Sequence, residues 1–221
     1  MPRMADAGTG ESRYFDAAAT GVVAYLVGYV LTYLLKSGDV SRAIADPQGL
    51  IGGVTVAEPA KWKMIAWLYA GMHNVPGVIR LQSGGRSTSQ ELRWSEAGPV
   101  WEAWLLLIPV LLLVFAGFGF ADESLDPGAD LWEGARSGAG VVLGYFPAAL
   151  LGAGATQWRA STSGLGGSVE IVIGVRIAEA ALIAGIVYPV FFGGLGGLFA
   201  ARESGGQSTS SPERGPRDRN R

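Results

Sequence analysis

The chain has 221 residues, of which 49% are hydrophobic and only 16% are charged, whereas charged residues make up about 25% of an ordinary soluble domain. Its net charge of −2 provides no basic surface for nucleic acid. The lack of cysteine and the single histidine exclude disulfides, cysteine nucleophiles and metal sites built from several histidines of one chain. We therefore expect no nucleic-acid partner, no metal and no cofactor.

Four stretches of the chain carry no charged residue at all: residues 17–35, 105–121, 137–158 and 180–201. Each is close to the length that a helix needs to cross about 30 Å of hydrocarbon at about 1.5 Å per residue. A soluble helix of this length would keep one polar face. The sequence therefore predicts a multi-pass protein of the cell membrane, surrounded by the lipid bilayer.

A fifth apolar segment, residues 62–79, is harder to interpret. It is apolar on average, but it contains Lys63, His73, Asn74 and Pro76. If this segment crosses the membrane, the fold is an all-α polytopic transmembrane helix bundle with five spans. The alternative is four spans plus a helix that lies in the interface. The five predicted spans are residues 15–35, 62–79, 101–121, 134–156 and 169–201.

Polar residues gather at the two ends of the chain and in the connections. Residues 1–14 are expected to form a flexible N-terminal arm, residues 15–201 the transmembrane helical domain, and residues 202–221 a disordered C-terminal tail. Acidic residues near the start argue against a cleavable signal peptide, and the apolar run at residues 50–57 is too short to span. The lysines and arginines near the span ends place the C-terminus in the cytoplasm with either number of spans. The N-terminus lies outside with five spans and inside with four.

Small residues recur at four-residue spacing in three predicted spans. Apolar contact alone gives helices in lipid little reason to associate, so close backbone approach over small residues is the main alternative. We expect these residues to pack helices within one bundle, and packing between protomers is the alternative. The residues are Ala24, Gly28, Gly140, Gly144, Gly193 and Gly197.

Two polar pairs lie at possible membrane depth. Arg176 and Glu179 stand three residues apart, so a helix would place them on one face, where they can form an ion pair. We expect them to anchor a helix at the membrane boundary, and the alternative is a gating or coupling pair within the membrane. His73 and Asn74 precede Pro76 and are expected to satisfy backbone groups at a kink. The alternative is a proton relay, because imidazole titrates near neutrality.

Enzymatic signatures are missing from the sequence. The chain lacks the motifs of zinc metalloproteases, serine hydrolases and P-loop enzymes, so we predict no catalytic residues and no enzymatic activity. The connection after residue 121 is acidic, but it lacks the spacing of a calcium-binding loop. A solvated surface is the simpler interpretation of these acids.

Two motifs carry a family resemblance: WLYAGMHNVP at residues 67–76 and VVLGYFPAALLG at residues 141–152. On these motifs the chain resembles a group of small uncharacterised polytopic membrane proteins of haloarchaea, over most of residues 15–200. Similar proteins combine an aromatic stretch with a small residue and a histidine in the second hydrophobic segment, and Met72-His73-Asn74 departs somewhat from that pattern. The resemblance implies a class of membrane protein and a habitat, but no activity.

Two functions follow from these observations as expectations. The favoured one is a structural or accessory component of a membrane assembly, whose partners are other membrane proteins or further copies of the chain itself. The alternative is a small transporter or channel that uses His73, Asn74, Arg176 and Glu179 along a path between helices. A shared water-filled cavity near the midplane would favour transport, whereas a dry bundle would favour the accessory role.

Overall fold

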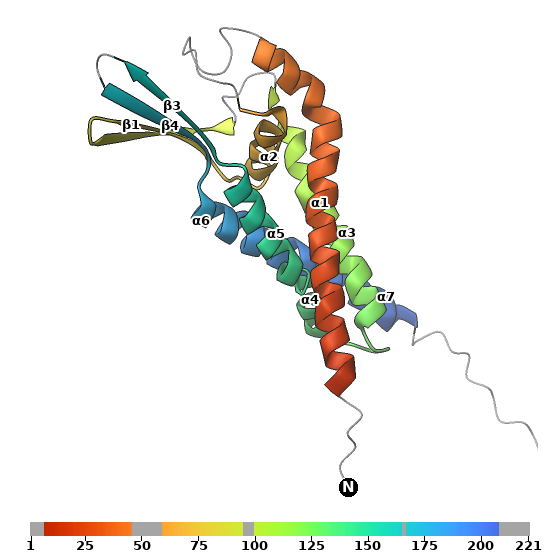
Figure 1. Cartoon of the computed structure of the whole chain (residues 1–221). Coiled ribbons are helices and arrows are strands. Elements are labelled where there is room, and N and C mark those ends of the chain that lie inside the picture. Colours follow the sequence, from red (N-terminus) through yellow and green to blue (C-terminus); the bar gives the residue numbers. More distant parts are fainter. Residues whose placement is uncertain (1–6, 46–58, 95–99, 165–166, 208–221) are drawn as a thin grey trace, which may run out of the picture.

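Long helices lie side by side in one body, and a small antiparallel sheet projects from one end of it (Figure 1). The computed structural model describes residues 7–45, 59–94, 100–164 and 167–207. The last helical stretch begins with the short helix α6 (Ile177–Glu179) and continues through two π-helical parts, η4 (Ala180–Val187) and η5 (Pro189–Gly193), into α7. This last helix, α7, covers Gly194–Gln207. The body also contains α1 (Ala7–Ala45), η3 (Ala103–Leu106), α3 (Leu107–Ser124), α4 (Leu131–Ala139) and α5 (Val142–Ala155).

Four helical stretches are long and apolar enough to cross a membrane by length and composition. Only 22–39% of the positions in their most apolar windows are buried within the chain. One large apolar side chain on each stretch illustrates the outward-facing surface: Leu34, Phe115, Leu151 and Phe191 are all at least 66% exposed. Soluble monomers rarely expose apolar patches of this extent. The prediction of a mainly helical chain with four such helices is confirmed, and their bounds are Ser12–Ala45, Ala103–Ser124, Leu131–Ala155 and Ile177–Ser204.

The fifth apolar segment does not form a long helix. It contains the helix α2 (Lys61–Gly71) of 11 residues, which is about 16 Å long and therefore much shorter than the hydrocarbon core. The chain then turns and enters a β-strand at Gly77. The prediction of a span over residues 62–79 is therefore not confirmed, and the predicted five-span bundle reduces to four candidate spans.

The predicted all-α class is wrong, because the described residues include a four-stranded sheet. Its strands are β1 (Gly77–Ser83), β2 (Arg86–Leu92), β3 (Trp158–Gly164) and β4 (Gly167–Val175). They run antiparallel in the order β2-β1-β4-β3. The spans predicted at residues 62–79, 134–156 and 169–201 leave β2 and β3 in connections, and the end of the first overlaps the start of β1. Most of β4 falls at the start of the last predicted span, because its apolar run precedes another apolar run without a break. The last helix begins only at Ile177.

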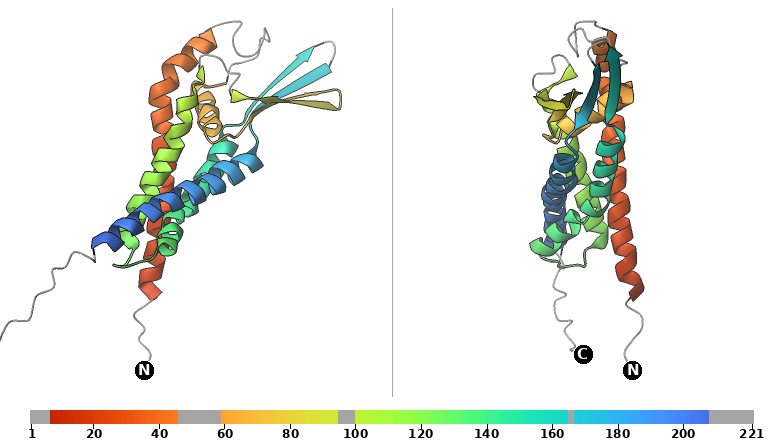
Figure 2. Two further views of the ribbon diagram at one scale, coloured as in Figure 1. Left: turned by 180° about the vertical axis from the view of Figure 1, so that it is seen from behind. Right: turned by 60° about the vertical axis from the view of Figure 1, so that its left-hand side comes forward.

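Two hairpins build this sheet and point their tips away from the helices (Figure 2). Gly84 and Gly85 form the tip of the first hairpin with φ of 56° and 79°, the conformation that a two-residue type I′ turn requires. At the base of the sheet, Gly77 pairs with Val175. The base of β4 is buried, and Ile171 and Ile173 belong to a core cluster with Trp67 of α2. The short helix α2 therefore packs against the base of the sheet.

Glycines allow the helices to approach until their backbones touch. A Cβ atom at Gly144 of α5 would overlap the carbonyl oxygen of Ala18 in α1, and a Cβ atom at Gly21 would overlap that of Val141. In the same way, a Cβ atom at Gly197 of α7 would overlap the carbonyl oxygen of Gly134 in α4. Only glycine can stand at these helix contacts.

The other small residues singled out in the sequence also lie at contacts within the chain. Ala24 is buried at 6% exposure, and a Cβ atom at Gly28 would overlap the hydroxyl group of Tyr69. A Cβ atom at Gly193 would lie 2.8 Å from the carbonyl oxygen of Gly138, and one at Gly140 would lie 3.6 Å from Ala17. None of these contacts requires a second protomer.

The ends of the described helices differ from the predicted domain limits. The helix α1 begins at Ala7, within the expected N-terminal arm, and α7 extends to Gln207, into the expected tail. Residues 1–6 and 208–221 lie outside the described residues, as does the apolar run at residues 50–57.

Candidate functional site

Apart from tyrosine and tryptophan, four polar side chains are buried among the described residues: Thr32, Lys36, His73 and Thr156. Thr32 and Thr156 donate hydrogen bonds to carbonyl groups four residues earlier in their own helices. His73 and Lys36 are ionisable, and each lies in a cluster that joins distant parts of the chain. These two clusters are the candidate sites of the molecule.

The His73 cluster joins the end of α2 to the first half of α5. His73 is 0% exposed, and its Nε2 atom lies 2.7 Å from the hydroxyl oxygen of Tyr145. The Tyr145 hydroxyl lies 2.8 Å from the hydroxyl of Tyr69. The Nδ1 atom of His73 lies 2.9 Å from the main-chain oxygen of the same Tyr69. Three residues therefore form a closed circuit of hydrogen bonds.

The direction of each hydrogen bond follows from the main-chain carbonyl of Tyr69, which can only accept. Nδ1 of His73 must therefore carry a proton and donate it. His73 lies outside the four long apolar helices, and burial lowers its pKa from 6.5 to about 4, because removal from water disfavours the charged ring. The neutral Nε2 atom then accepts from Tyr145, whose oxygen accepts from the Tyr69 hydroxyl. Every polar hydrogen of the circuit has an acceptor.

His73 also completes the end of α2. The carbonyl groups in the last turn of a helix lack partners within the helix, and Tyr69 lies in the last turn of α2. Its carbonyl oxygen accepts from the His73 side chain. The histidine therefore stabilises the point at which the chain leaves α2 and turns toward the sheet.

Aromatic rings fill the space around His73. Tyr25 of α1 packs edge-on against Tyr69 and Tyr145, with ring centroids 5.3 Å and 5.2 Å apart, and the Tyr188 ring lies 5.0 Å from the His73 ring. The adjoining cavity, which His73 lines, measures about 10 Å³. That volume holds about one water molecule at most, so the side chains around His73 leave almost no empty space.

Asn74 holds the turn after α2 in a left-handed conformation. Its φ is 59°, and its Nδ2 atom donates to the Tyr188 hydroxyl at 2.6 Å. Left-handed backbone costs most L-residues about 1–2 kcal/mol, and asparagine adopts it more readily than most. Asn74 therefore combines a backbone role with a contact to the last helical stretch.

Asn74→Val is expected to destabilise the protein by about 1–2 kcal/mol more than Asn74→Gly. Both substitutions remove the hydrogen bond to Tyr188, but only valine is strained at this φ. Thermal unfolding in detergent, followed by tryptophan fluorescence, compares the two variants. Equal melting temperatures would show that the turn is not left-handed.

Arg176 and Glu179 lie at the start of the last helical stretch, next to the base of the sheet. Their side chains are joined at 2.6 Å, and Arg176 also contacts Glu91 of β2 at 3.0 Å. All three side chains are 34–43% exposed, and Glu179 holds the pKa of Arg176 above its ordinary value through a hydrogen bond. The pair therefore connects the helix to the sheet at a solvated surface.

The four residues of the predicted transport path do not share a cavity in the described part of the chain. The small cavity beside His73 is lined by residues of α1, α2, α5, β4 and η4, but by neither Arg176 nor Glu179. Asn74 is exposed and bonded to Tyr188. The structure therefore separates His73 from the ion pair.

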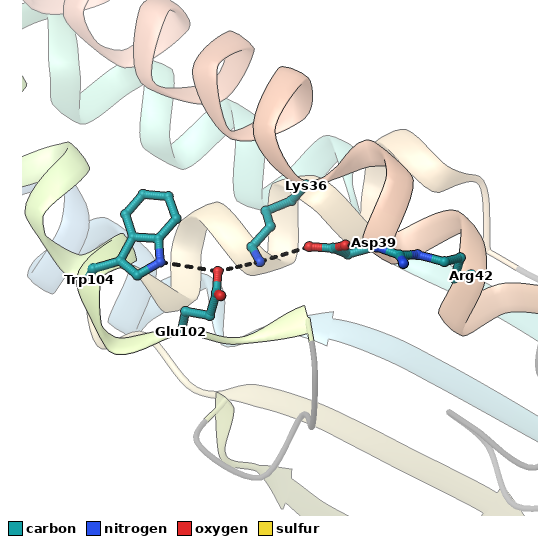
Figure 3. Close-up of polar contacts among 5 residues, drawn as sticks. All are labelled: Lys36, Asp39, Arg42, Glu102 and Trp104. Carbon is teal, nitrogen blue, oxygen red and sulfur yellow. Dashed lines mark hydrogen bonds and ion pairs between the residues drawn. The ribbon is translucent and has the colours of Figure 1, made fainter.

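The sequence did not predict the second cluster, which surrounds Lys36 in the C-terminal part of α1 (Figure 3). The Lys36 side chain is only 4% exposed, and its Nζ atom lies 2.8 Å from Asp39 and 2.7 Å from Glu102. Trp104 donates to the same Glu102 carboxylate at 3.1 Å, and Arg42 pairs with Asp39. The cluster joins α1 to the residues that lead into α3. No local sequence pattern indicates that Lys36 has two carboxylate partners.

Lys36→Met is expected to destabilise the protein by about 1–3 kcal/mol, because it leaves two carboxylates without their shared cation. The partial exposure of Asp39 and Glu102 limits the loss. The control is Arg42→Ala: Arg42 pairs with the same Asp39 but is 80% exposed, so its loss should change stability by less than about 0.5 kcal/mol. Denaturation in detergent measures both, and a larger loss at Arg42 would contradict the burial of Lys36.

A wider, open cavity lies at the opposite end of the bundle from the sheet. Its volume is about 410 Å³, and its lining includes Arg13, Asp126, Glu133 and Arg136. Both signs of charge are present, so the lining selects neither anions nor cations. This cavity is remote from the His73 cluster, with which it shares no lining residue.

Together these features define a mainly helical protein with four helices apolar enough to cross a membrane, a small antiparallel sheet at one end, and a buried histidine–tyrosine cluster between α2 and α5. The chain belongs to DUF7978, a family of unknown function whose model matches residues 3–204. No curated protein and no solved structure matches the chain. The expected membership of an uncharacterised family is thus confirmed, whereas a haloarchaeal source stays a prediction.

Proposed function

We propose that the protein is a multi-pass membrane protein with four spans that acts as a structural or accessory component of a membrane assembly. The observation that carries this proposal is the closed interior of the bundle. Its buried ionisable side chains Lys36 and His73 are each held by other groups of the same chain, and the space beside His73 is about 10 Å³. The solvated sheet, by contrast, extends away from the helices (Figure 2), where a partner can reach it.

Four spans give this protein a defined orientation. The start of α1 and the end of α7 lie at the end of the bundle opposite the sheet (Figure 2). The C-terminal residues 202–221 contain five arginines and no lysine, and such positive flanks stay in the cytoplasm. Under this proposal both ends of the chain are cytoplasmic, and α2 and the sheet lie on the other side of the membrane.

Transport along the predicted polar residues receives less support. A relay through His73 needs a ring that can exchange its proton with water, but both ring nitrogens are occupied by Tyr69 and Tyr145. A pathway also needs a continuous wet space, and Arg176 and Glu179 lie outside the cavity beside His73. The accessory role requires neither feature.

Cross-linking in native membranes tests the proposal. The full chain is cross-linked before extraction in mild detergent, and the mass and composition of the product are determined. We expect a complex of defined stoichiometry that is heavier than one chain. A lone monomer after cross-linking would overturn the accessory role.

The control is Tyr145→Phe, which opens the hydrogen-bond circuit but leaves the outer surface unchanged. The complex should persist in this variant, and vesicles that contain the wild-type protein should conduct protons no faster than empty vesicles. Proton flux that depends on the wild-type protein and disappears in Tyr145→Phe would establish the transport alternative instead.

A further inference from the structure

The two outer strands of the sheet, β2 and β3, have open edges in the part of the chain that the structure describes. Each has seven residues and pairs with an inner strand on one side only. Neither strand contains proline, and neither ladder has a bulge in its register. Proteins usually protect edge strands with such features, because a free row of N–H and C=O groups pairs with another chain.

The two edges are complementary to each other when β2 is aligned antiparallel to β3. If Leu92 stands opposite Trp158, then Glu91 stands opposite Arg159 and Ser89 opposite Ser161. An apolar pair, an opposite-charge pair and a hydroxyl pair result, and each of these contributes favourably between neighbouring strands. We propose that β2 of one molecule pairs in this register with β3 of a second copy of the chain. The inference rests on the proposed placement in a membrane.

The register is consistent with the two faces of the sheet. Within the chain, Ser89 pairs with Arg80, Arg80 with Val172, and Val172 with Arg159, so Ser89 and Arg159 lie on one face. Glu91 and Ser161 lie on that same face, because alternate residues of a strand share a face. Leu92 and Trp158 lie on the other face. Residues that stand opposite each other in a sheet must lie on the same face. All three proposed pairs meet this condition.

The charges favour this register over its neighbours. Arg159 is exposed and forms no ion pair among the described residues, whereas Glu91 contacts Arg176 through one carboxylate oxygen, Oε2. A shift of two residues in one direction places Trp158 opposite Gln90, and a shift in the other direction places Arg159 opposite Arg93. The proposed alignment alone joins Arg159 to an acid.

The orientation of the strands matches two molecules in one bilayer. Leu92 and Trp158 are both at the base of the sheet, next to the helices, and Arg86 and Gly164 are both at its tips. Antiparallel pairing of β2 with β3 therefore keeps both helical bundles at the same end of the joint sheet. Antiparallel pairing of β2 with another β2 would place the bundles at opposite ends, which one membrane does not permit.

The proposed contact uses different surfaces on the two copies, so it can repeat. Each added copy presents a free β2 edge and a free β3 edge, and such a heterologous interface forms a ring when its rotation closes. A ring around the membrane normal would join the sheets of all copies above the bilayer. The small-residue helix faces then serve packing within each copy.

Disulfide trapping tests the register, because the natural chain has no cysteine. Two tagged forms of the full chain, Ser89→Cys and Ser161→Cys, are produced together and oxidised in native membranes. We expect dimers that contain one copy of each form, and few dimers of either form with itself. Within one chain the two positions are more than about 14 Å apart, because three strand spacings and an offset of two residues separate them. That separation is too large for a disulfide.

The register control uses Ser87→Cys in place of Ser89→Cys. In the proposed register, Ser87 lies two residues away from the position opposite Ser161. The yield of mixed dimer between Ser87→Cys and Ser161→Cys should be lower by at least about fivefold. Equal yields at the two positions, or no mixed dimer at all, would overturn the inference. The chain that carries both Ser89→Cys and Ser161→Cys should form a ladder of multimers, and its restriction to monomers would also overturn it.

Charge reversal tests the pair of Glu91 and Arg159. Arg159→Glu should lower the yield of the mixed dimer about fivefold, and the addition of Glu91→Arg should restore most of it. Arg80→Glu is the control, because Arg80 lies on the same face but on the inner strand β1. A loss in Arg80→Glu as large as that in Arg159→Glu would contradict pairing at the edges.

The outcomes separate this inference from the proposed function. A complex with other membrane proteins in the absence of any mixed disulfide dimer would overturn the edge pairing and leave the accessory role intact. Mixed dimers that form in detergent-free water as readily as in membranes would overturn the membrane placement on which both depend.

Discussion

Replacement of Gly144 by leucine is expected to lower the free energy of unfolding by about 3 kcal/mol or more, the upper part of the range for overpacked contacts. A Cβ atom at this position would overlap the carbonyl oxygen of Ala18, and the other nearest atoms are also main-chain atoms of α1. Main-chain atoms cannot rotate away as a side chain can, so α1 and α5 would have to separate. Thermal unfolding in detergent measures the loss.

The matched control is Gly154→Leu in the same helix. Gly154 is exposed, and a Cβ atom there would meet no other atom within 4 Å. Its replacement should change stability by less than about 0.5 kcal/mol or improve it, because leucine favours helix more than glycine does. Similar losses in the two variants would show that α1 and α5 do not touch at Gly144.

A decrease from about pH 7 to about pH 5 is expected to destabilise the protein by about 2 kcal/mol through His73. Burial lowers the pKa of His73 from 6.5 in the unfolded chain to about 4 in the folded chain. Between these values the unfolded state binds the proton more readily than the folded state. The stabilisation is therefore complete above about pH 6.5 and is lost as the pH falls toward about 4.

The single histidine of the chain makes this effect easy to assign. His73→Gln should be less stable at neutral pH by about 1–3 kcal/mol, because the Tyr145 hydroxyl and the Tyr69 carbonyl lose well-placed partners. Its stability should no longer change between about pH 7 and pH 5. Unchanged pH dependence in this variant would show that another group is responsible and that His73 is not buried in its neutral form.

The long helices could be predicted from the sequence because a helix in hydrocarbon leaves a simple signal. An uninterrupted run without charge needs no knowledge of tertiary contacts, and three of the four stretches lie wholly within one helical region. The fourth, residues 137–158, passes the end of α5 at Ala155 and reaches the first residue of β3. The short helix α2 was harder, because Lys63 and Pro76 interrupt a segment whose average is apolar. Average hydropathy could not show that only Lys61–Gly71 is helical.

The sheet was missed because its strands resemble other elements. The apolar run of β4 resembles the beginning of a span, because consecutive residues from Ile171 to Val175 are all buried and the strand lacks polar alternation. The strands β2 and β3 are rich in serine and threonine and read as loops. One local signal was available: Gly84-Gly85 between two seven-residue runs is typical of a two-residue hairpin. That the two hairpins form one sheet depends on the pairing of β1 with β4, which no local pattern reveals.

The candidate site could be predicted only in part, for a physical reason. His73 was singled out by its residue type, but its partner Tyr145 is 72 positions away in the chain, and only the contact of α2 with α5 brings the two together. Lys36 is a buried lysine that no local sequence pattern indicates. Its burial depends on Glu102, which is 66 positions away. Residue types indicate candidates, whereas tertiary packing determines their partners.

Side-specific cysteine labelling in sealed membranes tests the four-span placement most directly, because the chain has no native cysteine. Single cysteines replace Asp126 between α3 and α4, Ser87 in β2, and Phe115, which is 70% exposed on α3. A membrane-impermeant maleimide should label Asp126→Cys only from the cytoplasmic side and Ser87→Cys only from the opposite side. Phe115→Cys should be protected by lipid from both. Labelling of all three positions from one side would contradict the proposed four-span placement in the membrane.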